Sequence, residues 1–83
     1  MEIKKNWIVY ILECGDGTLY TGITDDLQRR LAAHSAGKGA KYTRGRGPLI
    51  LQYQEQCESH SQALRREAQI KRLTRKQKQK LFN

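Results

Sequence analysis

Residues 7–12, Trp-Ile-Val-Tyr-Ile-Leu, form a nearly continuous run of β-branched and aromatic side chains. Such a run is typical of a strand that is buried on both faces. Residues 15–17, Gly-Asp-Gly, are a turn signal, and residues 19–24 have the composition of a returning strand. Together, these segments predict a β-hairpin.

The hairpin determines where its tyrosines point. With an odd number of residues in the connecting loop, Tyr10 and Tyr20 project from the same face. Gly22 shares that face with Tyr20, and its missing side chain leaves an opening beside the phenol. Two interpretations stay open at this point. The tyrosines either pack in a core beside a bulge glycine, or they form part of a functional site.

A helix is expected directly after the hairpin. Thr24 is its expected N-cap, and the helix should run to about Ser35 and stop before Gly37. Leu27 and Leu31, four residues apart, belong to its apolar stripe.

Arg30 and His34 border this apolar stripe, whereas Arg29 points away from it. A guanidinium that leans onto the sheet needs a partner such as a carboxylate or a phosphate. His34 has a simpler alternative, since an imidazole in the last turn of a helix also interacts favourably with the helix dipole.

The second half of the chain predicts one more strand and two helices. Residues 49–57 indicate the strand, and residues 62–73 indicate a helix that is capped by Ser59 or Ser61. A short basic helix over residues 75–82 is expected to end the chain, with Thr74 as its N-cap.

Glu67 lies on the apolar face of the helix predicted over residues 62–73. The expected inward stripe comprises Ala63, Ile70 and Leu73, widened by Leu64 and Ala68. A carboxylate on such a face requires an arginine partner, such as Arg30, or a metal ion.

Basic residues are unevenly distributed in this chain, whose net charge is +8. Residues 38–46 contain no acid, and residues 65–80 contain eight basic residues against Glu67 alone. This asymmetry is the electrostatic footprint of a polyanion binder. The glycine-rich connection over residues 36–48 suits close approach to phosphates, although a mobile surface loop is the alternative. The expected nucleic-acid contacts are Gly22, Lys38, Lys41, Tyr42, Arg44, Arg46, Lys71 and Arg72.

The length of 83 residues suits one domain, 1–83, with a single modest core. No apolar segment approaches the ~20 residues that cross a bilayer, and the N-terminus lacks the pattern of a signal peptide. We therefore expect a cytoplasmic protein without a membrane partner.

The two cysteines, Cys14 and Cys57, are expected to be reduced thiols. A zinc site from them with His34 and His60 would lack the paired short spacings of known structural sites.

The motifs resemble those of the GIY-YIG nuclease superfamily, and the similarity spans nearly the whole chain. Tyr10 closes the segment Ile8-Val9-Tyr10, and Tyr20 opens the segment Tyr20-Thr21-Gly22. The spacing of Gly22, Arg30 and His34, with Glu67 further on, is the more specific part of the match. The resemblance is greatest to small standalone bacterial members. It implies an α/β (α+β) fold, with a three-stranded antiparallel sheet flanked by helices.

The resemblance also implies roles for individual residues. Tyr10, assisted by Tyr20, would hold and deprotonate the attacking water, and nearby cations would favour its anion. Arg30 would bind the scissile phosphate. Glu67 would hold a divalent cation, Mg²⁺ or Mn²⁺, which keeps most of its waters. His34 stands where relatives carry a histidine or tyrosine that assists the site.

Several positions depart from the family pattern. Ile8 replaces the first glycine of the name motif, and Ile23 stands where some relatives have a polar or basic residue. No asparagine matches the one that several relatives carry beyond the metal-binding glutamate. Relatives usually gain substrate affinity from appended modules. Here either the basic loop and C-terminal helices suffice, or a protein partner supplies specificity.

The sequence thus predicts a metal-dependent endonuclease that hydrolyses phosphodiester bonds of nucleic acid. DNA is favoured over RNA, and damaged, branched or flapped structures with a role in repair are the expected substrates. The main alternative is a non-catalytic nucleic-acid-binding module of the same fold. A protein-interaction adaptor that uses the C-terminal basic helices is a third hypothesis.

Overall fold

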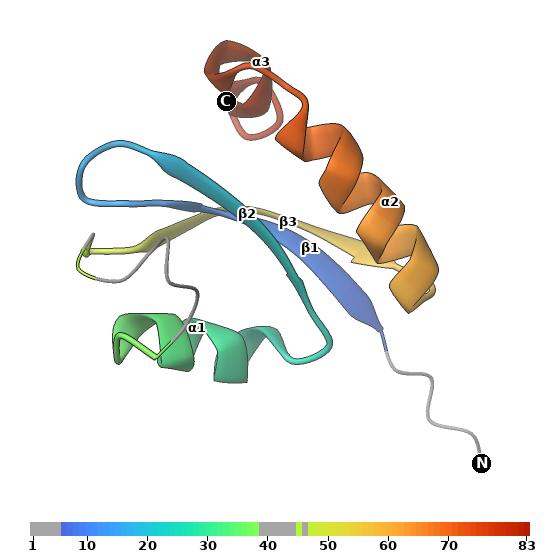
Figure 1. The fold of residues 1–83 in the computed structure, drawn as a ribbon, viewed down its shortest axis with the longest axis horizontal. Coiled ribbons are helices and arrows are strands. Elements are labelled where there is room, and N and C mark those ends of the chain that lie inside the picture. Colours follow the sequence, from blue (N-terminus) through green and yellow to red (C-terminus); the bar gives the residue numbers. More distant parts are fainter. Residues whose placement is uncertain (1–5, 39–44, 46) are drawn as a thin grey trace.

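The computed structural model describes residues 6–38, 45 and 47–83. Three strands and three helices follow one another along the chain (Figure 1). Their bounds are β1 Trp7–Glu13, β2 Leu19–Thr24, α1 Leu27–Ser35, β3 Ile50–Cys57, α2 His60–Lys71 and α3 Arg75–Gln79. Among the described residues, no helix is long and apolar enough to cross a membrane.

The strand β1 lies at the centre of the sheet, which has the order β2-β1-β3 and is antiparallel throughout. Its residues Val9, Tyr10, Ile11 and Leu12 have no exposed surface, as the continuous apolar run predicts. The three-stranded antiparallel sheet with flanking helices, an α+β fold, is therefore confirmed.

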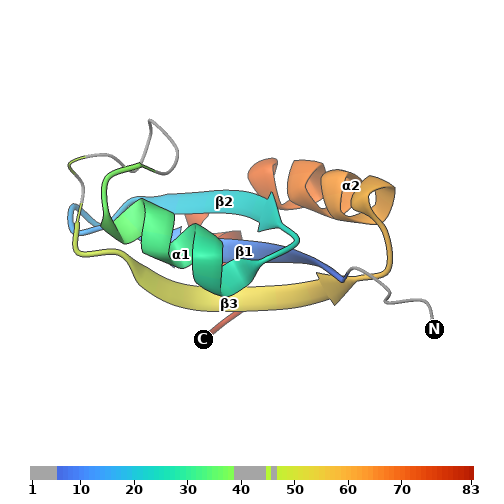
Figure 2. The same ribbon diagram turned by 90° about the horizontal axis from the view of Figure 1, so that it is seen from below.

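The two faces of the sheet have different partners (Figures 1 and 2). On one face, Val9 and Ile11 pack with Ala63 and Ile70 of α2 and with Cys57, which forms the hydrophobic core. The alternate residue Tyr10 points to the opposite face, which α1 covers, because successive strand side chains alternate. The sheet therefore separates α1 from α2.

Polar contacts attach α2 to β3 beside the core. Arg66 donates from Nε to both carboxylate oxygens of Glu55, at 3.0 and 3.1 Å, and the Tyr53 hydroxyl donates to the same carboxylate at 2.6 Å. Hydrogen bonds to an ionised partner are stronger than neutral ones. This network helps to hold α2 in place on the sheet.

The helix caps differ in part from those expected. Asp26, rather than Thr24, caps α1, since its carboxylate accepts a hydrogen bond from the Arg29 amide at 3.1 Å. Thr24 is the last residue of β2, and its hydroxyl stabilises the turn instead, by accepting from the Asp26 amide and donating to the Asp26 carbonyl. For α2, Ser59 is the cap, and its side chain accepts from the Gln62 amide.

Both C-terminal helices end earlier than predicted, and α2 also begins earlier, at His60 instead of residue 62. The helix α2 ends at Lys71 instead of residue 73, and α3 ends at Gln79 instead of residue 82. A capping box at Thr74 begins α3, so this cap is confirmed. Leu64 and Ala68 are exposed, contrary to the expected stripe, because α2 packs on the sheet along the narrower line of Ala63 and Ile70.

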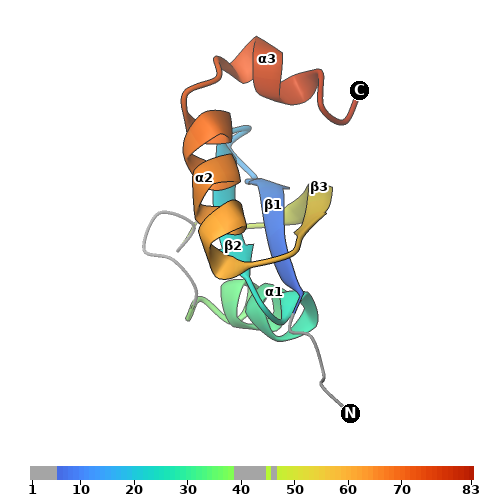
Figure 3. The same ribbon diagram turned by 90° about the vertical axis from the view of Figure 1, so that its right-hand side faces the viewer.

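The helix α3 turns away from α2 at the end of the chain (Figure 3). Arg75 donates a hydrogen bond to the carbonyl of Gly17 in the turn between β1 and β2. This bond connects the last helix to the first hairpin.

Candidate active site

Tyr10 and Gly22 lie directly opposite each other in the β1–β2 ladder. Five residues, 14–18, separate the paired Glu13 and Leu19, so the loop has the odd length that puts Tyr10 and Tyr20 on one face. A Cβ atom at Gly22 would lie 2.6 Å from the Tyr10 hydroxyl oxygen. The glycine is therefore required by the close approach of the phenol, which accounts for it without any contact to nucleic acid.

The Tyr10 hydroxyl lies 2.9 Å from Nε2 of His34, in the last turn of α1. His34 is only 3% exposed. The rings of Tyr10, Tyr20 and His34 pack together, with centroid distances of 5.5 to 6.3 Å between each pair. Residues from three elements thus form a single aromatic cluster on the α1 face of the sheet.

The electrostatic environment keeps the imidazole neutral and the phenol protonated. Burial, followed by the positive charge of Arg30, lowers the pKa of His34. Burial raises the pKa of Tyr10 more than its hydrogen bond with Arg30 lowers it. The direction of this hydrogen bond depends on the tautomer of His34: with its own proton on Nδ1, the neutral ring accepts the Tyr10 proton at Nε2. The free protein therefore holds a phenol and an acceptor for its proton, rather than the phenolate expected from the nearby cation.

Arg30 is the fixed cation of this cluster. A hydrogen bond with Tyr10 is the largest cause that raises its pKa, and Tyr20 adds to the effect. The guanidinium therefore stays charged at every physiological pH. Arg30 lies on the face of α1 that is directed toward the sheet, as its spacing from Leu27 predicts. It is half-buried.

Glu67 lies on α2. The pKa of Tyr10 is raised mainly by burial, and the charge of Glu67 makes the smallest contribution to it. Its carboxylate forms an ion pair with Lys71, at 3.5 Å, one turn along the same helix. Lys71 is therefore its ion-pair partner among the described residues, whereas the sequence predicted either an arginine such as Arg30 or a metal ion. The spacing of four residues is the signal that would have found this pair.

The candidate metal ligand is a single carboxylate. The side chain of Glu67 is 18% exposed, so it is not fully closed off from solvent. Such a ligand suits Mg²⁺, which keeps several waters and takes other ligands from substrate phosphates. No group of three or more His, Cys, Asp or Glu side chains in the described ranges is close enough to hold an ion by itself.

Cys14, Cys57, His34 and His60 do not assemble into a zinc site. Cys57 packs in the core on the α2 face of the sheet, whereas His34 lies with Tyr10 on the α1 face. Both cysteines are free and buried.

The structure places the expected nucleic-acid contacts in separate regions. Lys38 is exposed just after α1, and Lys71 and Arg72 are exposed at the end of α2. Lys41, Tyr42, Arg44 and Arg46 lie outside the described residues. The described part of the chain thus presents basic residues beside both helices that carry site residues.

The chain belongs to the GIY-YIG catalytic domain family, which matches residues 6–80. Its relatives include UPF0213 proteins. One from Halobacterium salinarum is 60% identical over 74 residues, which are 89% of this chain and 96% of that protein. One from Staphylococcus haemolyticus is 53% identical, over 89% of this chain and 90% of that protein.

Two solved structures have the same fold. The solution NMR structure of the UPF0213 protein BH0048 from Bacillus halodurans is 51% identical, with a TM-score of 0.59, over 92% of this chain and 81% of that one. The solution NMR structure of the protein EF2693 from E. faecalis is 43% identical, with a TM-score of 0.64, over 98% and 88%. The family and the fold that the motifs indicate are both confirmed.

Proposed function

We propose that this protein is a metal-dependent endonuclease that hydrolyses phosphodiester bonds of DNA. The observation that carries the proposal is the hydrogen bond between the Tyr10 hydroxyl and His34 Nε2, with the Arg30 guanidinium beside it. A buried phenol with its own proton acceptor and a fixed cation is a costly arrangement that packing alone does not require.

The Tyr10–His34 pair supplies a route for one proton. As an attacking water forms its bond to phosphorus, its proton passes to the Tyr10 oxygen while the phenolic proton passes to His34 Nε2. The lowered pKa of His34 keeps the imidazole unprotonated and ready to accept. Through this relay Tyr10 acts as a base without first becoming a stable phenolate, which burial disfavours.

Arg30 binds the scissile phosphate in this proposal. Its planar guanidinium matches two phosphate oxygens, and it stabilises the charge that develops on them in the transition state. Glu67 would hold a divalent cation, after releasing Lys71. When bound, Mg²⁺ or Mn²⁺ supplies Lewis-acid stabilisation of the phosphate and of the leaving oxygen.

The basic residues support DNA as the substrate class. The net charge of +8 favours a polyanion, and exposed Lys38, Lys71 and Arg72 border the helices that carry the site. No described feature selects for a ribose 2′-hydroxyl. Targeting to particular DNA structures would come from these residues or from a protein partner.

The test is cleavage of labelled duplex, single-stranded, flapped and branched DNA, with matched RNAs, in Mg²⁺, in Mn²⁺ and in EDTA. We expect Tyr10→Phe to reduce the single-turnover rate by about 10²–10⁴-fold, the usual contribution of a positioned proton-transfer group. Arg30→Ala should reduce it by about 10²–10³-fold, and Glu67→Gln should remove the response to metal.

Glu58→Gln is the matched control for Glu67→Gln, because Glu58 is exposed and precedes the same helix. It should cleave like the wild type. Full metal-dependent cleavage by Tyr10→Phe would exclude the proton relay. Thermal melting of each variant separates loss of chemistry from loss of fold.

A non-catalytic nucleic-acid-binding module is the second candidate. It is favoured by the ion pair of Glu67 with Lys71, which neutralises the carboxylate that would bind the metal. This hypothesis predicts salt-dependent binding of the same DNAs with no cleavage in either metal. Metal-dependent cleavage that is lost in Glu67→Gln would exclude it.

A further inference from the structure

Thr21 is a buried polar residue that the proposed reaction leaves unused. It belongs to β2 and is 3% exposed. Its hydroxyl oxygen has no hydrogen-bond partner among the described residues. A buried hydroxyl without a partner costs free energy, and valine would fill the same space without this cost. An unpaired group of this kind requires an explanation.

The side chain of Thr21 lies on the face of the sheet that α2 covers. Its partner in the β1–β2 ladder is Ile11, which packs in the core with Ala63 and Ile70 of α2. Residues that are paired in an antiparallel ladder project to the same face of the sheet. The hydroxyl is therefore on the side of α2, and the cluster around Tyr10 is on the other side.

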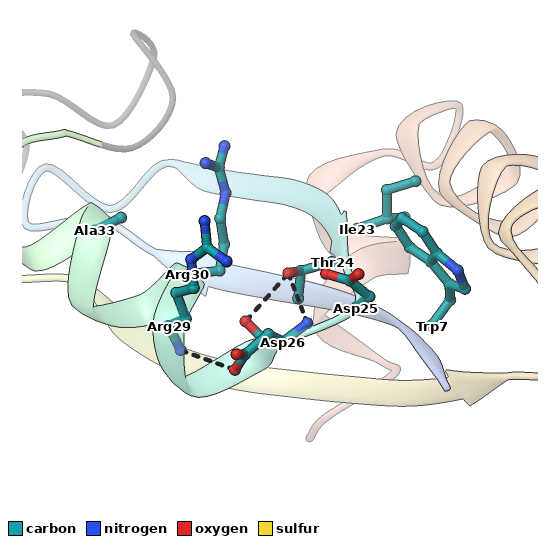
Figure 4. A pocket seen from close by; sticks show the side chains of 8 residues that line it. All are labelled: Trp7, Ile23, Thr24, Asp25, Asp26, Arg29, Arg30 and Ala33. Carbon is teal, nitrogen blue, oxygen red and sulfur yellow. Dashed lines mark hydrogen bonds between the residues drawn. The ribbon is translucent and has the colours of Figure 1, made fainter. Parts of the chain in front are cut away.

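The end of β2 lies beside the beginning of α2. A pocket of about 360 Å³ opens next to Arg30, and Ile23 and Trp7 lie together at its far end (Figure 4). The Trp7 ring packs on the ring of His60, the first residue of α2, with a centroid distance of 4.2 Å. The last part of β2 is thereby held close to the first turn of α2.

The beginning of β2 lies near the end of α2. Arg75, shortly after α2, donates a hydrogen bond to the carbonyl of Gly17, shortly before β2. The two elements contact each other, and α2 lies along β2 (Figure 3). They therefore run in opposite directions.

Glu67 is the residue of α2 that is level with Thr21. Thr21 lies three residues before the end of β2, a distance of about 10 Å along a strand. Glu67 lies seven residues after the first residue of α2, which is also about 10 Å along a helix. It shares a helix face with Ala63 and Ile70, which pack on the sheet.

A second observation also places Glu67 near this part of β2. The charge of Glu67 is one of the causes that raise the pKa of Tyr10. The Tyr10 hydroxyl lies against Gly22, where a Cβ atom would be 2.6 Å from it. Gly22 follows Thr21 directly in β2.

We propose that Thr21 is a positioning residue for Glu67, and that its hydroxyl donates a hydrogen bond to the Glu67 carboxylate when this carboxylate holds the divalent cation. This inference rests on the proposed function, which assigns the cation to Glu67. In the free protein the carboxylate oxygen Oε2 lies 3.5 Å from Nζ of Lys71, and the Thr21 hydroxyl is left unpaired. Release of Lys71 frees the carboxylate to accept the hydroxyl proton.

The chemistry of a lone carboxylate ligand accounts for this role. Carboxylates that bind a metal are themselves hydrogen-bonded, which fixes their orientation. Glu67 has no second acidic ligand beside it in the described ranges, so its own orientation determines the site. The hydroxyl of a threonine rotates to suit its acceptor, and the stiff χ1 of Thr21 reduces the entropy that the contact costs.

The first experiment measures metal binding by the free protein. Mg²⁺ is titrated into the 83-residue chain, and the amide chemical shifts around Glu67 are followed by NMR. We expect Thr21→Val to raise the Kd for Mg²⁺ about tenfold, the low end of the usual cost of losing such a partner. Thr21→Ser keeps the hydroxyl and should bind Mg²⁺ like the wild type.

A double-mutant cycle tests whether the effect acts through Glu67. In Glu67→Gln the addition of Thr21→Val should cause no further loss of Mg²⁺ affinity, because the partner is already gone. Ile70→Val is the matched control, since it changes the packing of the same face of α2 and removes no polar group. It should leave the Kd unchanged.

Thermal melting separates this role from a purely structural one. In EDTA, Thr21→Val should melt above the wild type, because it removes an unpaired hydroxyl. On addition of Mg²⁺, its melting temperature should rise less than that of the wild type, since a ligand stabilises according to its affinity. A residue that only supports the fold would not raise stability and lower metal affinity together.

The outcomes distinguish the two proposals. Equal Mg²⁺ affinity in the wild type and Thr21→Val, with affinity lost in Glu67→Gln, overturns the role of Thr21 and leaves the nuclease function intact. Coupled Mg²⁺ binding without cleavage of any DNA supports the role of Thr21 and contradicts the nuclease function. Mg²⁺ binding that is absent, or that is unchanged in Glu67→Gln, overturns the role of Thr21 together with the metal assignment.

Discussion

Tyr10 has no exposed surface, and its hydroxyl lies 2.9 Å from Nε2 of His34 in α1. Its position depends on Gly22, since a Cβ atom there would lie 2.6 Å from the phenolic oxygen. A buried polar group of this kind destabilises the fold unless its hydrogen bonds are made. The residues around Tyr10 are therefore constrained together, and a change in one of them displaces the others.

The lowered pKa of His34 predicts how stability depends on pH. Burial and Arg30 hold this pKa below its usual value of 6.5, so the unfolded chain binds the proton more readily than the folded chain. The contribution of His34 is then fully present above pH 6.5, and it is lost as the pH falls from 6.5 through the lowered folded pKa.

Chemical denaturation of the wild type and His34→Gln between pH 7.5 and about pH 5 measures this effect. The midpoint of the wild type should fall more steeply with acid than that of the variant. The cleavage rate of the wild type should fall over the same range, since protonated His34 accepts no proton. Parallel curves for the two proteins would contradict the assignment.

Thr21 is a second buried polar residue, and it differs from Tyr10 in the hydrogen bonding of its hydroxyl. It is 3% exposed on the α2 face, and its hydroxyl oxygen has no hydrogen-bond partner among the described residues. We expect Thr21→Val, which keeps the shape and removes the hydroxyl, to raise the free energy of unfolding by about 1 kcal/mol. Urea denaturation measures it, and Thr21→Ser is the control that keeps the hydroxyl. A lower midpoint for Thr21→Val would mean that the hydroxyl is hydrogen-bonded.

At the scale of the elements, the sheet lies between the two helices that supply the site. The helix α1 brings Arg30 and His34 to one face, and α2 packs on the other face with Ala63 and Ile70 inward. Glu67 belongs to α2, so its distance from Tyr10 depends on how that helix sits on the sheet. Its attachment combines the core, the Arg66–Glu55 ion pair and the cap at Ser59.

The cap of α2 gives a direct comparison of two serines. Ser59 accepts a hydrogen bond from the Gln62 amide at 3.1 Å, whereas Ser61 lies within the first turn. We expect Ser59→Ala to reduce the free energy of unfolding by about 1 kcal/mol and Ser61→Ala to leave it almost unchanged. Thermal or urea denaturation of both variants tests this. A larger effect at Ser61 would mean that α2 begins two residues later.

At the scale of the whole molecule, charge dominates association with other molecules. The chain has a net charge of +8, and exposed basic residues stand at the end of α1 and along α2 and α3. Each phosphate that they neutralise releases counterions. Affinity for DNA should therefore depend steeply on ionic strength, whether or not the bound DNA is cleaved.

We expect the affinity to fall by about 100-fold or more between roughly 50 and 200 mM salt, as for a protein that neutralises several phosphates. Fluorescence anisotropy in EDTA measures it. Lys38→Gln and Arg72→Gln should each reduce the slope of log K against log salt by about one. Binding that is insensitive to salt would contradict both nucleic-acid hypotheses.

Much of the architecture was predictable from local patterns. The continuous apolar run of β1, the glycine turn after it and the 3.6-residue periodicity of α1 and α2 depend on residues that are close in sequence. The family motifs added the antiparallel sheet of three strands, and the observed strand pairing confirms it. Helix ends were less predictable. Thr24 and Asp26 are both good caps, and only the extent of β2 determines which of them starts α1.

The sequence by itself therefore determined most of the elements and the family, and it supplied the site residues as predictions. The tertiary structure decided which of those residues meet. Tyr10 and His34 are 24 positions apart and bond across the sheet–helix interface, and the pocket beside Arg30 requires both ends of the hairpin. Such contacts depend on how the elements pack, and no pattern along one strand or helix specifies that.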